Sequence, residues 1–69
     1  MDKQFADKLL ETIKKKGITR IKIAEVTGID YQRLIRILRQ EVSTKAWEFL
    51  SLCAFLGIEP RDYTPTIED

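Results

Sequence analysis

The side chains best suited to specific hydrogen bonding lie in one short segment and share planar polar groups: Gln32, Arg33, Arg36 and Arg39. Carboxamide and guanidinium groups pair with the edges of DNA bases and with phosphates. The segment follows Gly28, and another short helical pattern precedes that glycine. Residues 19–39 therefore predict two short helices joined by a tight turn. This is the form of a helix-turn-helix, and it makes DNA the first candidate ligand.

The basic charge of the chain gathers in the same region. The 69 residues carry a net charge of only +1. Residues 14–40, however, contain eight basic and two acidic residues, a net charge of +6, against −1 for residues 1–13 and −4 for residues 41–69. A one-sided basic patch suits contact with phosphates. The alternative is an ordinary solvated surface.

Apolar residues at helical spacing predict a helix over residues 3–16, with Asp2 as its cap and Gly17 at its end. A second helix starts after Thr19 and stops at Gly28, and a third runs from the cap Asp30 to about residue 39. The residues expected to be buried in these two helices and their turn are Ile23, Ala24, Ile29, Leu34 and Ile37.

A fourth helix is expected after Ser43 or Thr44 as cap, and Gly57 ends it. Its predicted apolar stripe consists of Ala46, Phe49, Leu50, Cys53 and Leu56. Ile58 and Tyr63 follow as residues that return to the core around a short turn. The sequence thus predicts an all-α, compact four- to five-helix bundle over residues 1–63 and a flexible C-terminal tail over residues 64–69.

Composition narrows the class of protein. No apolar run approaches the roughly 20 residues of a membrane span, and the charged N-terminal residues do not form a signal peptide, so we expect a cytoplasmic protein without membrane contact. The chain has one cysteine, Cys53, and no histidine. No Cys/His metal site and no cofactor are therefore expected. Cys53 lies on an apolar stripe, which favours a core residue over a reactive thiol.

From about Leu9 to Tyr63 the pattern resembles the Cro and phage-repressor family of helix-turn-helix domains. The resemblance is carried by Ile18-Thr19, Ile23-Ala24, Gly28-Ile29, Leu34 with Ile37, and the segment Leu52-Cys53-Ala54-Phe55-Leu56-Gly57-Ile58. It implies a lambda-repressor-like bundle whose third helix enters the DNA major groove, usually as a homodimer on a near-palindromic operator.

The resemblance also implies roles for particular residues. The base contacts would come from the start of the third helix: Tyr31, Gln32, Arg33 and Arg36. The phosphate contacts would come from the start of the second helix and the flanking basic residues: Arg20, Lys22, Lys16 and Arg39. Lysines near a helix C-terminus, such as Lys16, are also favoured by the helix dipole alone.

Several residues depart from the family pattern. Ile13 and Leu38 replace a buried Arg and Glu that pair in many members, and the joint replacement avoids an unpaired buried charge. Gln40 stands where the family has glycine after the third helix, which suggests a different helix end. Asp30 caps well but would repel a nearby phosphate.

Three hydrophobic residues fall at positions that are usually polar and exposed: Ile21, Ile35 and Trp47. They are candidates for a protein interface, with Trp47 as the best single candidate for an anchor. The alternative is that small loop shifts bury them.

These patterns favour a DNA-binding transcription regulator of the small phage or mobile-element kind over other classes. The alternative is an antirepressor-type protein-interaction module that binds another regulator's DNA-binding domain through the exposed apolar residues. An enzyme is not expected, because the chain lacks histidine and shows no pair of acids on a shared apolar face.

Overall fold

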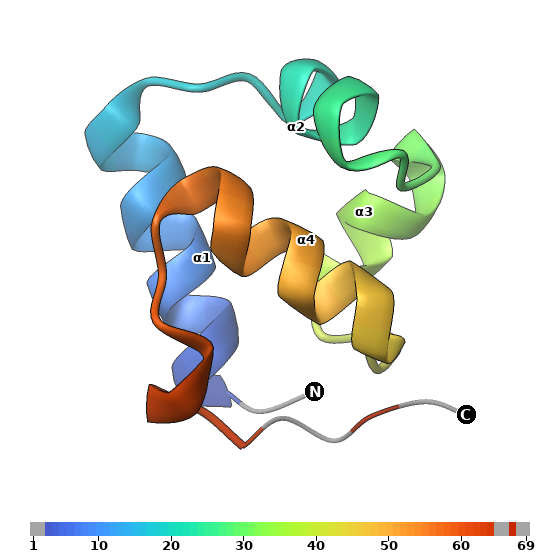
Figure 1. Cartoon of the computed structure of the whole chain (residues 1–69). Helices are drawn as coiled ribbons and strands as arrows, with labels where there is room; N and C mark the ends of the chain where they lie inside the picture. The colour runs from blue at the N-terminus through green and yellow to red at the C-terminus, as the bar shows by residue number, and fades with distance from the viewer. Residues whose placement is uncertain (1–2, 65–66, 68–69) are drawn as a thin grey trace.

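Four α-helices and one short 3-10 helix make up the described part of the chain (Figure 1). The computed structural model describes residues 3–64 and residue 67. The elements are α1 (Lys3–Lys16), α2 (Arg20–Thr27), α3 (Tyr31–Leu38), α4 (Ala46–Leu56) and the 3-10 helix η1 (Pro60–Asp62). No strand forms within these residues, where Thr44 and Ile67 make only an isolated parallel β-bridge. The prediction of an all-α fold is confirmed.

The core lies between the four helices. Both α3 and α4 pack against α1 and α2. In Figure 1, α4 lies in the middle of the molecule, between α1 and α3. The ring of Phe5 from α1 lies with its centroid 4.7 Å from that of Phe49 in α4 and 5.6 Å from that of Tyr63. Tyr63 therefore returns to the core as expected. The radius of gyration is 10.6 Å, which is typical of a compact domain of this size.

The residues predicted to cap α2 and α3 and to form the turn between them do so in the structure. The Thr19 hydroxyl accepts a hydrogen bond from the backbone N–H of Lys22 at 3.1 Å. Gly28 adopts the left-handed conformation with φ 78°, which glycine tolerates without strain, and ends α2. Asp30 then caps α3 by accepting from the N–H of Arg33 at 3.2 Å. The buried Ile29 fills the turn between the two helices.

One predicted helix boundary changes, and one suggested change, a different end of α3, does not occur. Ser43 and Thr44 are not the caps of the fourth helix, because α4 begins at Ala46 with Lys45 at the N-cap. The Lys45 N–H donates to the Glu48 carboxylate at 2.7 Å instead. After α3, Gln40 takes a left-handed conformation with φ 63°. The chain therefore turns at Gln40 as it would at a glycine. Asp2, the expected cap of α1, lies outside the described residues.

Burial confirms most of the predicted core and corrects part of it. Ile13 and Leu38 are both buried in one apolar cluster, as their joint replacement predicts. Cys53 is buried too, and burial followed by the nearby charge of Glu59 raises the pKa of its thiol to about 11. The prediction for α4 was wrong at Ala46 and Leu50, which are exposed, whereas Leu52 is buried. The buried face of α4 is therefore rotated relative to the predicted stripe.

Candidate nucleic-acid interface

The outer face of α3 carries three exposed side chains, all able to form hydrogen bonds: Tyr31, Gln32 and Arg36. The opposite face buries Leu34, Ile37 and Leu38. This division follows from the helical repeat, since residues three or four apart share a face. No carboxylate lies within α3 itself.

Gln32 and Arg36, one helical turn apart, border the same groove. Its volume is about 390 Å³, and it is lined by Asp30, Gln32, Arg33, Arg36 and Val42. A carboxamide and a guanidinium in neighbouring positions can each form two parallel hydrogen bonds with a planar partner. The groove is thus suited to planar, hydrogen-bonding ligands such as base edges.

Arg33 lies beside these residues but binds within the protein. Its Nε donates to Glu48 Oε2 at 2.5 Å and its Nη2 donates to Glu48 Oε1 at 3.0 Å. A further hydrogen bond joins Arg33 Nη2 to the carbonyl oxygen of Ser43 at 3.1 Å. The predicted base contact is therefore already engaged in a bidentate ion pair. This pair ties the first turn of α3 to the first turn of α4.

Glu48 was not expected as a site residue. Its side chain is 1% exposed, against 26% for Arg33. Burial alone would raise the pKa of the Glu48 carboxyl, but hydrogen bonds from Arg33 and from the Lys45 N–H, together with the positive charges of both residues, lower that pKa below its ordinary value. The carboxylate is therefore ionised at neutral pH. Its position three residues after the helix N-cap was the available sequence signal.

Asp30 is bound by the helix that it caps. Its carboxylate accepts the backbone N–H of Arg33. Negative charge at a helix N-terminus is stabilised by the helix dipole, which accounts for an acid at this point of a basic surface. The carboxylate remains exposed at the edge of the groove.

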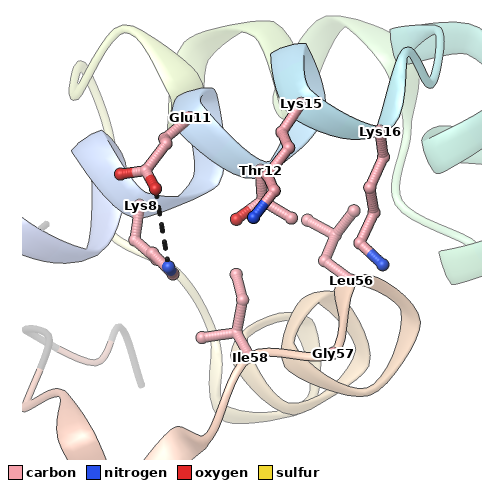
Figure 2. A pocket seen from close by; sticks show the side chains of 8 residues that line it. All are labelled: Lys8, Glu11, Thr12, Lys15, Lys16, Leu56, Gly57 and Ile58. Carbon is pink, nitrogen blue, oxygen red and sulfur yellow. Dashed lines mark ion pairs between the residues drawn. The ribbon is translucent and has the colours of Figure 1, made fainter.

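The predicted phosphate contacts occupy more than one surface. Arg20 and Lys22 are exposed in the first turn of α2. Arg39 is exposed just after α3, with its Nη1 3.9 Å from a Glu41 oxygen. Lys16 instead lines a separate pocket of about 380 Å³ between α1 and the end of α4, shown in Figure 2.

This second pocket is basic but lacks the planar groups of the α3 groove. Lys8, Lys15 and Lys16 stand around it, and Lys8 Nζ lies 3.7 Å from a Glu11 oxygen. Leu56 and Ile58 face them from the other wall (Figure 2). Among the predicted phosphate contacts, Lys16 is thus the one that lines this second pocket, here called the lysine pocket.

The predicted interface residues differ in exposure. Ile21 is 60% exposed and Trp47 is 48% exposed, so both are on the surface as expected. Ile35 is only partly exposed, because it sits on the flank of α3. Leu50, which was expected inside, is 55% exposed and lies on α4 one turn after Trp47.

Comparison of the chain with protein-family models, with curated proteins and with solved structures finds no match. Within the described residues, no helix is both long and apolar enough to cross a membrane. The same residues contain no group of three or more His, Cys, Asp or Glu side chains that could bind a metal ion.

Proposed function

We propose that the protein is a sequence-specific DNA-binding regulator of the Cro and phage-repressor type, with α3 as the helix that enters the major groove. One observation carries this proposal. The exposed positions of α3 are Tyr31, Gln32 and Arg36, which can all form hydrogen bonds, while its other face is packed into the core. Such a helix presents a rigid polar surface of a width that the major groove accepts.

Each side chain has a role that fits its chemistry. Gln32 can pair with adenine and Arg36 with guanine through two hydrogen bonds each, while the Tyr31 ring packs on a thymine methyl or bonds a phosphate. Phosphate contacts come from the start of α2 and from the residue after α3: Arg20, Lys22 and Arg39. Lys16 lines the separate pocket and takes no part in this contact. Arg33 acts as a positioning residue, because its ion pair with Glu48 fixes the first turn of α3. Occupying an operator would then block or recruit polymerase.

The experiment is a selection from a random duplex library at low salt, followed by binding measurements on variants. We expect an enriched motif, and we expect Arg36→Ala to lose affinity for it by about 1–3 kcal/mol while relaxing preference at one base position. Arg61→Ala is the matched control, since Arg61 is 88% exposed and lies outside the α2–α3 segment. Absence of an enriched motif, or equal losses in the two variants, would count against the proposal.

A second candidate is an antirepressor-type module that binds another regulator's DNA-binding domain. The exposure of Ile21 and Trp47 favours it, because large exposed hydrophobic residues on a small domain suggest a protein interface. The two functions separate in one comparison. Undetectable DNA binding together with stoichiometric binding to a purified regulator domain from the native host would favour the second.

A further inference from the structure

The lysine pocket contains a polar group that has no partner within the described part of the chain. Thr12 is only 8% exposed, and its side chain lines the pocket (Figure 2). No described residue forms a hydrogen bond with its hydroxyl. In contrast to the fully enclosed hydroxyl of Thr44, the Thr12 oxygen reaches the pocket. This hydroxyl can therefore bond to a molecule that enters the pocket.

Three lysines stand around this hydroxyl on α1. Lys8, Thr12 and Lys15 follow the i, i+4, i+7 spacing that places side chains in one row along a helix, and Lys16 lies beside them. Lys8 is engaged with an acid, since its Nζ lies 3.7 Å from a Glu11 oxygen. Lys15 and Lys16 form no ion pair with any described residue. Two ammonium groups are thus available to an anion.

The opposite wall comes from the end of α4 and is aliphatic. Leu56 and Ile58 face the lysines across the pocket (Figure 2). The volume of about 380 Å³ is near the lower end of the range of small-molecule sites, roughly 300–1,000 Å³. Even at roughly 30 Å³ per heavy atom, the volume of one water molecule, the five heavy atoms of a phosphate fill less than half of it. An anion that fills the pocket therefore also has an apolar part.

The two helix ends at this pocket oppose an anion, but the lysines outweigh them. α1 ends at Lys16 and α4 at Leu56, and each helix C-terminus carries about −0.5 elementary charge. Three lysines and Glu11 together give +2, so a net charge of about +1 remains. The helix dipole favours lysines in the last turn of α1. It falls off within that turn, so it accounts neither for Lys8 nor for the Thr12 hydroxyl.

We propose that the lysine pocket binds a small organic phosphate. Its phosphate group lies against Thr12, Lys15 and Lys16, and its apolar part packs on Leu56 and Ile58. Ammonium groups bind phosphate as point charges, and a threonine hydroxyl donates to its oxygens. A phosphate monoester carries about −1.5 to −2 charge at pH 7, which suits two unpaired lysines better than the single charge of a carboxylate.

Because the two lysines are exposed to solvent, we expect a dissociation constant on the order of millimolar. This inference stands on α1 and α4 and does not depend on DNA binding by α3.

A nuclear magnetic resonance titration of the labelled full chain with butyl phosphate at low salt tests the site. We expect saturable shifts at the backbone amides of Thr12, Lys16, Gly57 and Ile58. Inorganic phosphate should bind at least about fourfold more weakly, the equivalent of one buried methylene group. Butylamine, which has the same apolar part but a positive charge, should not bind.

Substitutions separate a built site from general attraction to a basic surface. Thr12→Val keeps the shape of the side chain and should weaken binding of butyl phosphate about tenfold, because a hydrogen bond to a charged group is lost. Lys15→Gln should weaken it about fivefold. Lys14→Gln is the matched control, since it removes the same charge from the same helix end but does not line the pocket. Glu11→Gln should strengthen binding several-fold, because it removes the negative charge and releases Lys8.

Phosphate monoesters also occur on membrane surfaces, so vesicles that contain phosphatidic acid form a separate arm. We expect the chain not to sediment with them, because Leu56 and Ile58 are buried in the wall of the pocket and do not protrude. Vesicle binding without saturable binding of butyl phosphate would overturn the proposal of a small soluble ligand.

Three further results would overturn the proposed site. The first is a titration with butyl phosphate that leaves the pocket amides unshifted or is matched in affinity by inorganic phosphate. The second is an equal loss of affinity in Lys14→Gln and Lys15→Gln. The third is unchanged binding by Thr12→Val, with circular dichroism showing that the variant is folded.

Discussion

The Arg33 guanidinium donates hydrogen bonds to both carboxylate oxygens of Glu48 and to the carbonyl oxygen of Ser43. These partners lie 15 and 10 residues along the chain. Helical periodicity and capping rules describe neighbours within one or two turns, so they cannot show such a pair. Local patterns therefore predict Arg33 at the DNA surface and give no sign of its ion pair with Glu48.

Replacing Glu48 tests the structural role of the pair. We expect Glu48→Gln to lower the free energy of unfolding by about 2 kcal/mol, because the partly buried Arg33 loses its charged partner. Urea denaturation followed by circular dichroism measures this change. Glu41→Gln is the control, since it neutralises an exposed acid in a loose pair with Arg39. Equal stability of the two variants would contradict a structural role for Glu48.

The same pair predicts a pH dependence. The Glu48 pKa is lowered in the folded state, so the ionised carboxylate stabilises the fold above its unfolded pKa, and this contribution is lost as the pH falls through the folded value. The stability difference between the wild type and Glu48→Gln should therefore shrink between about pH 5 and pH 3. A difference that stays constant over that range would contradict the lowered pKa.

Asp30 stabilises α3 as its N-cap, but in the proposed complex its negative charge weakens DNA binding. A single substitution separates these two effects. Asp30→Asn keeps an N-cap side chain and removes the negative charge at the edge of the α3 groove. We expect stability within about 0.5 kcal/mol of the wild type and a several-fold gain in DNA affinity at low salt. Unfolding curves and binding isotherms measure the two effects. Unchanged or weaker DNA binding would place Asp30 away from the phosphates.

At the scale of elements, the bounds of α1, α2 and α3 follow from local sequence. The caps and the turn are formed by Thr19, Gly28 and Asp30 with their immediate neighbours. The local sequence therefore predicts them directly. The start and orientation of α4 depend on contacts with other elements. Glu48 caps the backbone of Lys45 while pairing with α3, and Leu50 faces outward because the rest of α4 turns toward α1 and α2.

The end of α3 gives a prediction at this scale. Gln40 has φ 63°, a conformation that costs a residue with a Cβ atom about 1 kcal/mol or more. Gln40→Gly should therefore raise the free energy of unfolding by roughly 0.5–1 kcal/mol, whereas Gln40→Ala should give no gain. Thermal unfolding of both variants checks this. Equal stabilities for the glycine and alanine variants would show that the turn carries no such strain.

At the scale of the whole molecule, the sequence predicts the helical bundle and the position of a polar, basic α3, because apolar spacing and charge distribution are readable along the chain. The way in which the surface grooves are separated in space cannot be predicted from these patterns. The α3 groove, the pocket between α1 and the end of α4, and a third groove between the end of α2 and α4 are three separate surfaces. Two of them join elements far apart in the sequence.

The most direct test of the central claim is a nuclear magnetic resonance titration of the labelled protein with the duplex recovered by selection. We expect the largest chemical-shift changes at Tyr31, Gln32 and Arg36, with smaller changes at Arg20 and Lys22 and little change in the lysine pocket. An equimolar duplex with a scrambled sequence should shift only the signals of the phosphate-contact residues Arg20, Lys22 and Arg39. Shifts confined to α4, or no shifts at α3 with either duplex, would contradict the account.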